Sequence, residues 1–328
     1  MPITPVSVFE LRAGSRGAMD RSAREFRIPT VMATRFRWAA GVVVAAVCAF
    51  AAGGIILCEE SLHVRKVRPF PVPAFAAWRE VAIKAHDGAV LRAWLVSPET
   101  SNGNCVLTLH GVADGRRGTL GLARLFVENH YTVLMPDSRG HGESGGEIAT
   151  YGLLEREDVH RWVDWLVSSE RPRNVFAMGE SLGAGILLQS LAVEHRFTAV
   201  AAESPFADFE QIAEYRVAQR LPIGGLIGRA LARPMVWSGF LYAKWKYGMD
   251  FRAANAAGIV ANVSTPILLI HGLDDTNIPP DHSRMLASRN PSSITLWLVP
   301  GAAHTGAFAT APEQFRSRVL GWFSEHAH

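Results

Sequence analysis

Residues 173–195 read RNVFAMGESLGAGILLQSLAVEH and contain the most informative pattern in the chain. A short apolar run, Val175 to Met178, is typical of a buried strand, and the apolar spacing after it is typical of a helix. Between them lies Gly179-Glu180-Ser181-Leu182-Gly183, which matches the pattern G-x-S-x-G. A strand that passes at once into a helix needs a sharp turn, in which side chains two residues from the serine would clash. The pattern therefore predicts that the Ser181 hydroxyl stands clear of a sheet, at a helix N-terminus that favours negative charge.

A second stretch, residues 142–146, also matches G-x-S-x-G. The strand expected before it, residues 131–136, ends well before Ser144, and Gly-Gly-Glu follows instead of a helical pattern. We therefore interpret Ser144 as a loop residue and Ser181 as the nucleophile. The alternative for Ser181 is a serine that caps a helix after a tight turn.

Beyond about residue 79, expected strands alternate with expected helices. Two alternating strands, residues 80–85 and 89–96, flank the turn signal His86-Asp87-Gly88. The further expected strands are residues 105–109, 131–136, 175–178, 198–202, 267–271 and 294–299, and expected helices include residues 120–128, 153–167 and 312–323. This alternation predicts an α/β protein with a mainly parallel sheet covered by helices on both faces.

The alternation is interrupted once, by an insertion rich in large apolar residues. We interpret residues 206–262 as a helical cap, or lid, over the sheet. The aromatic-rich part of the cap predicts a pocket for the acyl or aromatic part of a substrate. The expected substrate-binding residues are Trp237, Phe240, Leu241 and Trp245. Packing within the cap and contact with a membrane surface are alternative roles for the same side chains.

The N-terminal part of the chain contains an uncharged apolar stretch, residues 38–58. About 20 apolar residues suffice to cross a bilayer as a helix. We interpret residues 1–37 as a basic leader that is disordered or precedes the true start, 38–58 as a transmembrane signal anchor, and 59–78 as a Pro-rich linker. Arg35 and Arg37 before the span favour a cytoplasmic N-terminus and a single-pass protein with its body on the exported side. A signal peptide cleaved near Ala51 and a buried core helix are the alternatives.

Charge and cysteine content exclude several classes of function. Residues 1–37 carry seven Arg against three acidic residues, a balance of 7 − 3 = +4, so the net charge of +3 leaves 3 − 4 = −1 for the rest. A near-neutral body has no basic surface for nucleic acid. The three cysteines form neither a disulfide framework nor a metal-binding spacing.

A nucleophilic serine needs a base to remove its proton and a carboxylate to orient that base. Residues 271–279, HGLDDTNIP, and residues 300–304, PGAAH, each follow an expected strand. Ligands meet parallel sheets at the carboxyl ends of the strands, so these two loops should carry the partners of Ser181. They offer His304 as the base, and Asp274 or Asp275 as the carboxylate.

Five segments in the same order resemble the α/β-hydrolase superfamily. They are residues 109–111 (LHG), 137–144 (DSRGHGES), 179–183 (GESLG), 271–279 (HGLDDTNIP) and 301–304 (GAAH). Within that superfamily the chain is similar to the membrane-anchored serine hydrolases of the BEM46-like group. The resemblance implies an α/β-hydrolase core formed by residues 79–205 and 263–328, with the helical cap inserted between them and an N-terminal transmembrane helix.

The same resemblance implies the site and the activity. Ser181, Asp275 and His304 would form a catalytic triad, and the backbone N–H groups of Val112 and Leu182 would form the oxyanion hole. The expected activity is cleavage of a carboxylic ester through an acyl-enzyme; thioesters or small peptides are alternative substrates. A non-catalytic, membrane-anchored binding protein is the second class of function. The expected partners are a small ester or lipid-like substrate and the membrane; no nucleic acid, cofactor or metal is expected.

Overall fold

The computed structural model describes residues 30–67 and 73–328, so most of the expected basic leader lies outside the described residues. The described residues divide into two units, with the division between Val47 and Cys48. Helix α1 (Thr30–Leu62) runs through this division. Within α1, the segment Arg37–Leu62 is long and apolar enough to cross a membrane.

The helix extends beyond the predicted span of residues 38–58 at both ends. At its C-terminal end it continues through Glu59 and Glu60, because glutamate and leucine are good helix formers. The predicted linker therefore begins after Leu62, and its residues 68–72 lie outside the described part of the chain.

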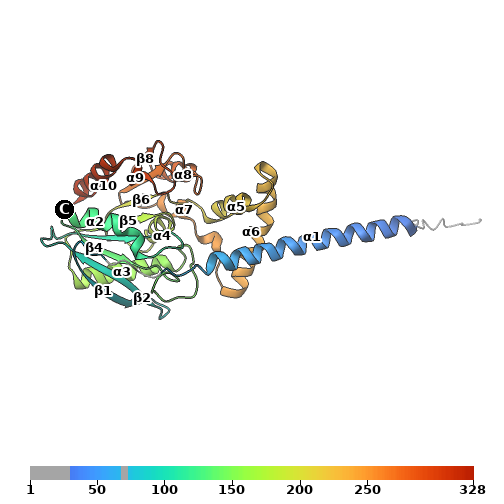
Figure 1. Ribbon diagram of the computed structural model, residues 1–328, viewed down its shortest axis with the longest axis horizontal. Coiled ribbons are helices and arrows are strands. Elements are labelled where there is room, and N and C mark those ends of the chain that lie inside the picture. Colours follow the sequence, from blue (N-terminus) through green and yellow to red (C-terminus); the bar gives the residue numbers. More distant parts are fainter. Residues whose placement is uncertain (1–29, 68–72) are drawn as a thin grey trace, which may run out of the picture. The chain divides into compact units, whose positions relative to one another are not determined.

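Eight strands form one sheet in the order β1-β2-β4-β3-β5-β6-β7-β8 (Figure 1). The strands are β1 (Ala77–Lys84), β2 (Val90–Ser97), β3 (Cys105–Leu109), β4 (Thr132–Pro136), β5 (Val175–Glu180), β6 (Phe197–Glu203), β7 (Ile267–Gly272) and β8 (Ile294–Val299). β1 and β2 form the predicted antiparallel hairpin, β2 is antiparallel to β4, and all other neighbours are parallel. The prediction of a mainly parallel sheet is confirmed.

Helices cover both faces of the sheet, as expected for strands that are apolar throughout. On β5, Phe176 and Met178 point to the face covered by α2 (Leu120–Glu128) and α10 (Pro312–His326). Val175 and Ala177 point to the opposite face. That face is covered by α3 (Glu155–Ser169), α4 (Leu182–Ser190), α7 (Ala256–Val260) and α8 (Asp281–Arg289). The short elements η1 (Arg116–Thr119) and α9 (Ala307–Thr310) lie in loops at the carboxyl ends of β3 and β8.

The predicted cap region is helical. Residues 206–262 contain α5 (Phe209–Arg220), α6 (Gly225–Tyr247), η2 (Phe251–Ala253) and α7. α6 ends at Gly248, whose left-handed conformation (φ 70°) is the usual termination of a helix by glycine. A separate apolar cluster, which includes Val236, Phe240 and Phe251, joins the cap to Leu62 at the end of α1.

Candidate active site

Ser181 lies in a strained turn between β5 and α4. Its backbone has φ 53° and ψ −114°, a left-handed φ that is costly for a residue with a side chain. A Cβ atom on Gly179 would lie 2.5 Å from the carbonyl oxygen of Gly183, and one on Gly183 would lie 2.3 Å from that of Leu109. Both glycines of the motif are therefore required by close backbone approach, as the sequence pattern predicts.

A chain of hydrogen bonds links Ser181 to His304 and Asp275. The distance from His304 Nε2 to Ser181 Oγ is 2.8 Å, and that from His304 Nδ1 to Asp275 Oδ2 is 2.7 Å. An ionised carboxylate can only accept hydrogen bonds, so His304 Nδ1 must be the donor to Asp275. The other ring nitrogen, Nε2, then carries no proton and can accept the proton of the Ser181 hydroxyl. The three residues follow the carboxyl ends of β5, β7 and β8, which lie at the same edge of the sheet with β6 between β5 and β7. The parallel sheet therefore brings together residues that are far apart in the sequence.

The Asp275 carboxylate is held in its ionised form. Its Oδ1 atom accepts hydrogen bonds from the N–H groups of Asn277 and Ile278, each 2.9 Å long. Burial disfavours the charge, but the contacts with His271, His304 and Ile278 outweigh it and hold the pKa of Asp275 well below its usual range. Asp274, the other acid left open by the spacing, has an exposed side chain, and its N–H donates to Ala302.

The two residues whose N–H groups are expected to form the oxyanion hole lie beside Ser181. Val112 and Leu182 line the same cleft as Ser181. A Cβ atom on Gly111 would lie 3.5 Å from the Cβ of Ser181, so the loop after β3 passes close to Ser181. Within residues 30–67 and 73–328, neither N–H donates to a protein acceptor. Both are therefore free to bind an anionic oxygen.

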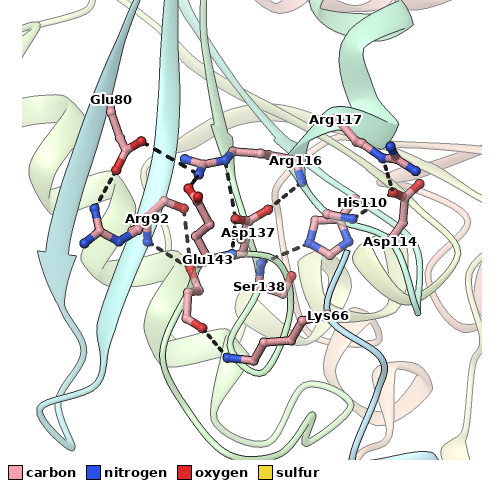
Figure 2. A network of polar contacts seen from close by, with 12 residues as sticks. Lys66, Glu80, Arg92, His110, Asp114, Arg116, Arg117, Asp137, Ser138 and Glu143 are labelled. Atoms are coloured by element: carbon pink, nitrogen blue, oxygen red, sulfur yellow. Dashed lines mark hydrogen bonds and ion pairs between the residues drawn. The ribbon is translucent and has the colours of Figure 1, made fainter. Parts of the chain in front are cut away.

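A buried polar network fixes the loop that carries Val112 (Figure 2). The Ser138 N–H donates to His110 Nε2 at 3.0 Å, and the two oxygens of Asp137 accept from the N–H groups of Arg116 and Glu143. Figure 2 shows Asp137 between these two residues and His110 beside Ser138. Burial and the neighbouring imidazole of His141 lower the pKa of His110 to about 3, so His110 stays neutral and can accept this bond.

Ser144, the serine of the second G-x-S-x-G, belongs to the same network. Its hydroxyl is buried, donates to the carbonyl of Asp137 at 2.7 Å and accepts the N–H of Arg92 at 2.9 Å. The Ser144 carbonyl accepts a bond from Lys66, which follows α1. Ser144 thus lies in a loop and supports its conformation, as the sequence context predicts.

Glu203, at the carboxyl end of β6, is a site residue that the sequence analysis did not identify. It is fully buried, and its Oε1 accepts the N–H of Ala307 at 2.9 Å. The adjacent Ser204 Oγ accepts the N–H of Thr305. The end of β6 therefore holds the loop that contains His304. Burial raises the pKa of Glu203 to about 7. The sequence feature that could have identified Glu203 is its position, because it is a charged residue directly after a predicted apolar strand.

Ser181 and His304 line a cleft of about 810 Å³. Its apolar wall combines residues from α1 and α5 that no local pattern could associate: Leu57, with Phe209, Ile212, Ala213 and Val217. A smaller cavity of about 60 Å³ shares six of its lining residues with this cleft, namely Leu57, Ser61, Tyr151, Phe209, Ala213 and Val217. The described residues contain no cluster of three or more His, Cys, Asp or Glu that could hold a metal ion.

The predicted pocket residues of the cap lie elsewhere. Trp237, Leu241 and Trp245 line neither cavity and are exposed on the outside of α6. Phe240 is buried, lines the smaller cavity and stacks on Phe209 with ring centroids 5.8 Å apart. Three of the four predicted residues therefore lie outside both cavities, because α6 is apolar on both sides and its sequence does not show which side faces the sheet. α5 and the end of α1 supply the apolar wall instead.

Comparisons with known proteins agree with this architecture. A family profile described as "Alpha/beta hydrolase family" matches residues 106–318. Protein YqkD of Bacillus subtilis is 25% identical over 71% of this chain and 74% of its own length. A monoacylglycerol lipase of Mycolicibacterium smegmatis is 25% identical over 70% of this chain and 91% of its own length. The structure of the esterase Pf2001 of Pyrococcus furiosus aligns with a TM-score of 0.66 and 21% identity, covering 81% of this chain and 100% of that one.

Proposed function

Because this chain belongs to the alpha/beta hydrolase family, we propose that it is a serine hydrolase that cleaves a carboxylic ester through an acyl-enzyme on Ser181. The observation that carries the proposal is the chain of hydrogen bonds from Asp275 through His304 to Ser181, which opens into a large cleft. The similarity to a monoacylglycerol lipase supports an ester substrate. The narrower resemblance to the BEM46-like group stays a prediction.

In the first half of the reaction, Ser181 Oγ attacks the carbonyl carbon of the ester while His304 Nε2 takes the hydroxyl proton. Asp275 stabilises the resulting imidazolium by accepting its Nδ1–H. The carbonyl oxygen becomes an oxyanion, which the N–H groups of Val112 and Leu182 bind. The tetrahedral intermediate then collapses, and the alcohol leaves with the proton from His304.

In the second half, a water molecule gives its proton to His304 and attacks the acyl-enzyme. The same two N–H groups bind the second oxyanion, and the acid is released as Ser181 recovers its proton. Glu203 lies behind the loop of His304 and has no direct part in these transfers. Its place in the site is to position that loop.

Thioesters and small peptides would use the same residues, and a non-catalytic binding protein would use none of them. Labelling with a fluorophosphonate probe separates catalysis from binding, because the probe reacts only with an activated serine. We expect the wild-type protein to be labelled, the Ser181→Ala variant to be unlabelled, and the matched Ser144→Ala variant to be labelled. Ser144→Ala should lower the melting temperature, since it removes one buried and one partly buried hydrogen bond. Equal labelling of the Ser181→Ala variant would refute the proposal.

The substrate class is tested with p-nitrophenyl esters, acyl thioesters and aminoacyl anilides at matched concentrations. We expect the highest kcat/KM with the esters. A preference for thioesters or anilides would retain the mechanism but reassign the bond that is cleaved.

α1 is proposed to anchor the protein as a single-pass helix, with the hydrolase body on the exported side. The support is the apolar segment Arg37–Leu62, preceded by Arg35. Carbonate extraction of membranes should leave the full-length protein in the pellet, and external protease should reach its body in spheroplasts. A soluble exported form that begins near Ala51 would show a cleaved signal peptide instead.

A further inference from the structure

The outer side of α6 carries an unusual exposed apolar surface. Outside α1, the described large apolar side chains that are more than half exposed are Leu226, Ile227, Trp237 and Trp245. All four belong to α6, with exposed fractions of 84%, 64%, 53% and 82%. Exposed large apolar side chains that gather on one element usually mark an interaction site.

These side chains share one face of the helix. At about 100° per residue, Leu226, Ile227, Trp237, Leu241 and Trp245 fall within an arc of about 100°. The opposite face is buried and consists mostly of small residues: Gly228, Ala232, Val236, Gly239, Phe240 and Ala243. We call the exposed arc the outer face of α6. The helix also contains four basic residues and no acidic ones, a composition typical of helices that lie at a membrane interface.

α6 packs directly on the C-terminal part of α1, within the unit of residues 48–328. A Cβ atom on Gly54 would lie 2.1 Å from the carbonyl oxygen of Met235, and one on Gly239 would lie 2.8 Å from that of Gly54. Near the end of α1, the Glu59 carboxylate accepts bonds from Lys246 at 3.0 Å and from the Tyr247 hydroxyl at 2.8 Å. α6 is thus fixed at the C-terminal end of the candidate membrane span.

The position of α6 on α1 gives its depth in the bilayer. Gly54 is four residues from the end of the uncharged stretch 38–58, which is about 6 Å along a helix. If α1 leaves the hydrocarbon layer near Cys58, where this stretch ends, α6 lies near the boundary between acyl chains and headgroups. Tryptophan and basic side chains concentrate at this boundary. We propose that the outer face of α6 docks on the bilayer surface and that the substrate is a single-chain acyl ester that enters the cleft from the membrane. The inference rests on the proposed function and on α1 as the anchor.

The cleft provides the route for such a substrate. Its wall includes Leu57 and Ser61 of α1, so the part of the helix that leaves the membrane also borders the site of Ser181. Facing it are Phe209 and Val217 of α5, and the smaller apolar cavity continues from the shared residues to Phe240. Apolar side chains of α1 and α5 therefore line the same cleft as Ser181, together with the charged side chains of Glu60, Arg65, Arg216 and Arg220. One acyl chain fits this description better than two, because the cavity behind the cleft holds only about 60 Å³.

Docking is tested by tryptophan quenching on the full-length protein in phosphatidylcholine vesicles. The difference in fluorescence between the wild type and a Trp237→Phe or Trp245→Phe variant gives the signal of that single indole. Trp78→Phe on β1 is the matched control, because Trp78 is also exposed. We expect brominated acyl chains to quench Trp237 and Trp245 but not Trp78, and aqueous iodide to reach only Trp78. Iodide quenching of Trp237 and Trp245 would overturn the proposal. Protection from both quenchers would also overturn it and would assign the face to a second copy of the chain.

Delivery is tested with a long-chain monoacylglycerol in the same vesicles and with p-nitrophenyl acetate in solution. Trp237→Gln, Leu241→Gln and Trp245→Gln are combined in one variant, and Val90→Gln with Val167→Gln serves as control, since both valines are exposed on other elements. We expect the first variant to lose at least about tenfold on the vesicle substrate, since each large apolar side chain contributes substantial membrane binding, and to keep its rate on the acetate. A ratio of the two rates equal to that of the control would overturn the proposal. Wild-type protein that cleaves neither substrate would instead refute the hydrolase function, and the quenching result would still decide docking.

Discussion

The Nδ1 atom of His304 lies 2.7 Å from Oδ2 of Asp275, and this contact decides which of two adjacent acids orients the imidazole. Asp275 is buried, and its second oxygen accepts two backbone N–H groups, so the carboxylate cannot rotate freely. Asp274 points to solvent. The order of the two acids in the chain could not separate them; the direction of the turn after β7 does.

We predict that Asp275→Asn lowers kcat/KM by about 10³- to 10⁴-fold, because an amide can no longer hold His304 in the tautomer that accepts the serine proton. Asp274→Asn is the matched control and should stay within about tenfold of wild type, since its side chain is exposed. Steady-state kinetics with one p-nitrophenyl ester compare the two. The reverse ranking would transfer the orienting role to Asp274.

Gly183 should tolerate no side chain. A Cβ atom there would lie 2.3 Å from the carbonyl oxygen of Leu109, so Gly183→Ala must displace β3 or the start of α4. We expect a loss of about 1–3 kcal/mol in the free energy of unfolding, together with a large fall in kcat, because the N–H of Leu182 moves. Gly321→Ala is the control, since its Cβ would meet no atom within 4 Å. Urea unfolding and kinetics on both variants check this; equal stability of the two would contradict it.

Glu203 should make stability depend on pH. Burial raises its pKa from an ordinary value near 4.5 to about 7, so between these values the folded chain binds a proton that the unfolded chain has lost. The contribution of Glu203 to the free energy of unfolding is therefore complete below about pH 4.5. It is lost as the pH rises to about 7, at up to about 1.4 kcal/mol per pH unit. Glu203→Gln should remove this dependence, whereas Glu99→Gln, at an exposed position, should not.

Urea unfolding at pH 5, 6, 7 and 8 measures the effect as the difference between variant and wild type. The Glu203→Gln protein should gain in relative stability as pH rises through this window. Parallel curves for the three proteins would show that Glu203 ionises in the folded state as it does in the unfolded chain.

Ala213 on α5 should limit the acyl chain. It lines both the cleft and the smaller cavity, so Ala213→Trp should block the passage between them. Losing the burial of three methylenes, at about 0.8 kcal/mol each, would lower the ratio of kcat/KM for octanoyl over acetyl esters roughly fiftyfold. Trp237→Ala, on the outer face of α6, should leave this ratio unchanged for soluble esters. A changed ratio in the Trp237 variant, with none in the Ala213 variant, would restore the predicted pocket in α6.

Local patterns identified most of the core. β3, β8 and α2 have the predicted bounds, and the other predicted strands and helices differ by a few residues at their ends. These elements are short and apolar, and turn residues bound them, so neighbours in the sequence determine them. The sequence placed Ser181, His304 and the pair Asp274 and Asp275 in loops after strands for a related reason, because the parallel sheet fixes the carboxyl ends of its strands. The choice of Asp275 over Asp274 came from the family resemblance.

The tertiary structure alone decided the walls of the site. Leu57 and Phe209 line one cleft although they are separated by most of the hydrolase core, and no periodicity connects them. α6 shows most clearly what the sequence alone could not decide. It carries apolar side chains on two opposite faces, so the sequence predicted a helix but not which face packs inward. Contact with Gly54 settles this, because only the face with Gly239 allows the two backbones to approach closely. That packing leaves Trp237 and Trp245 outside the cleft.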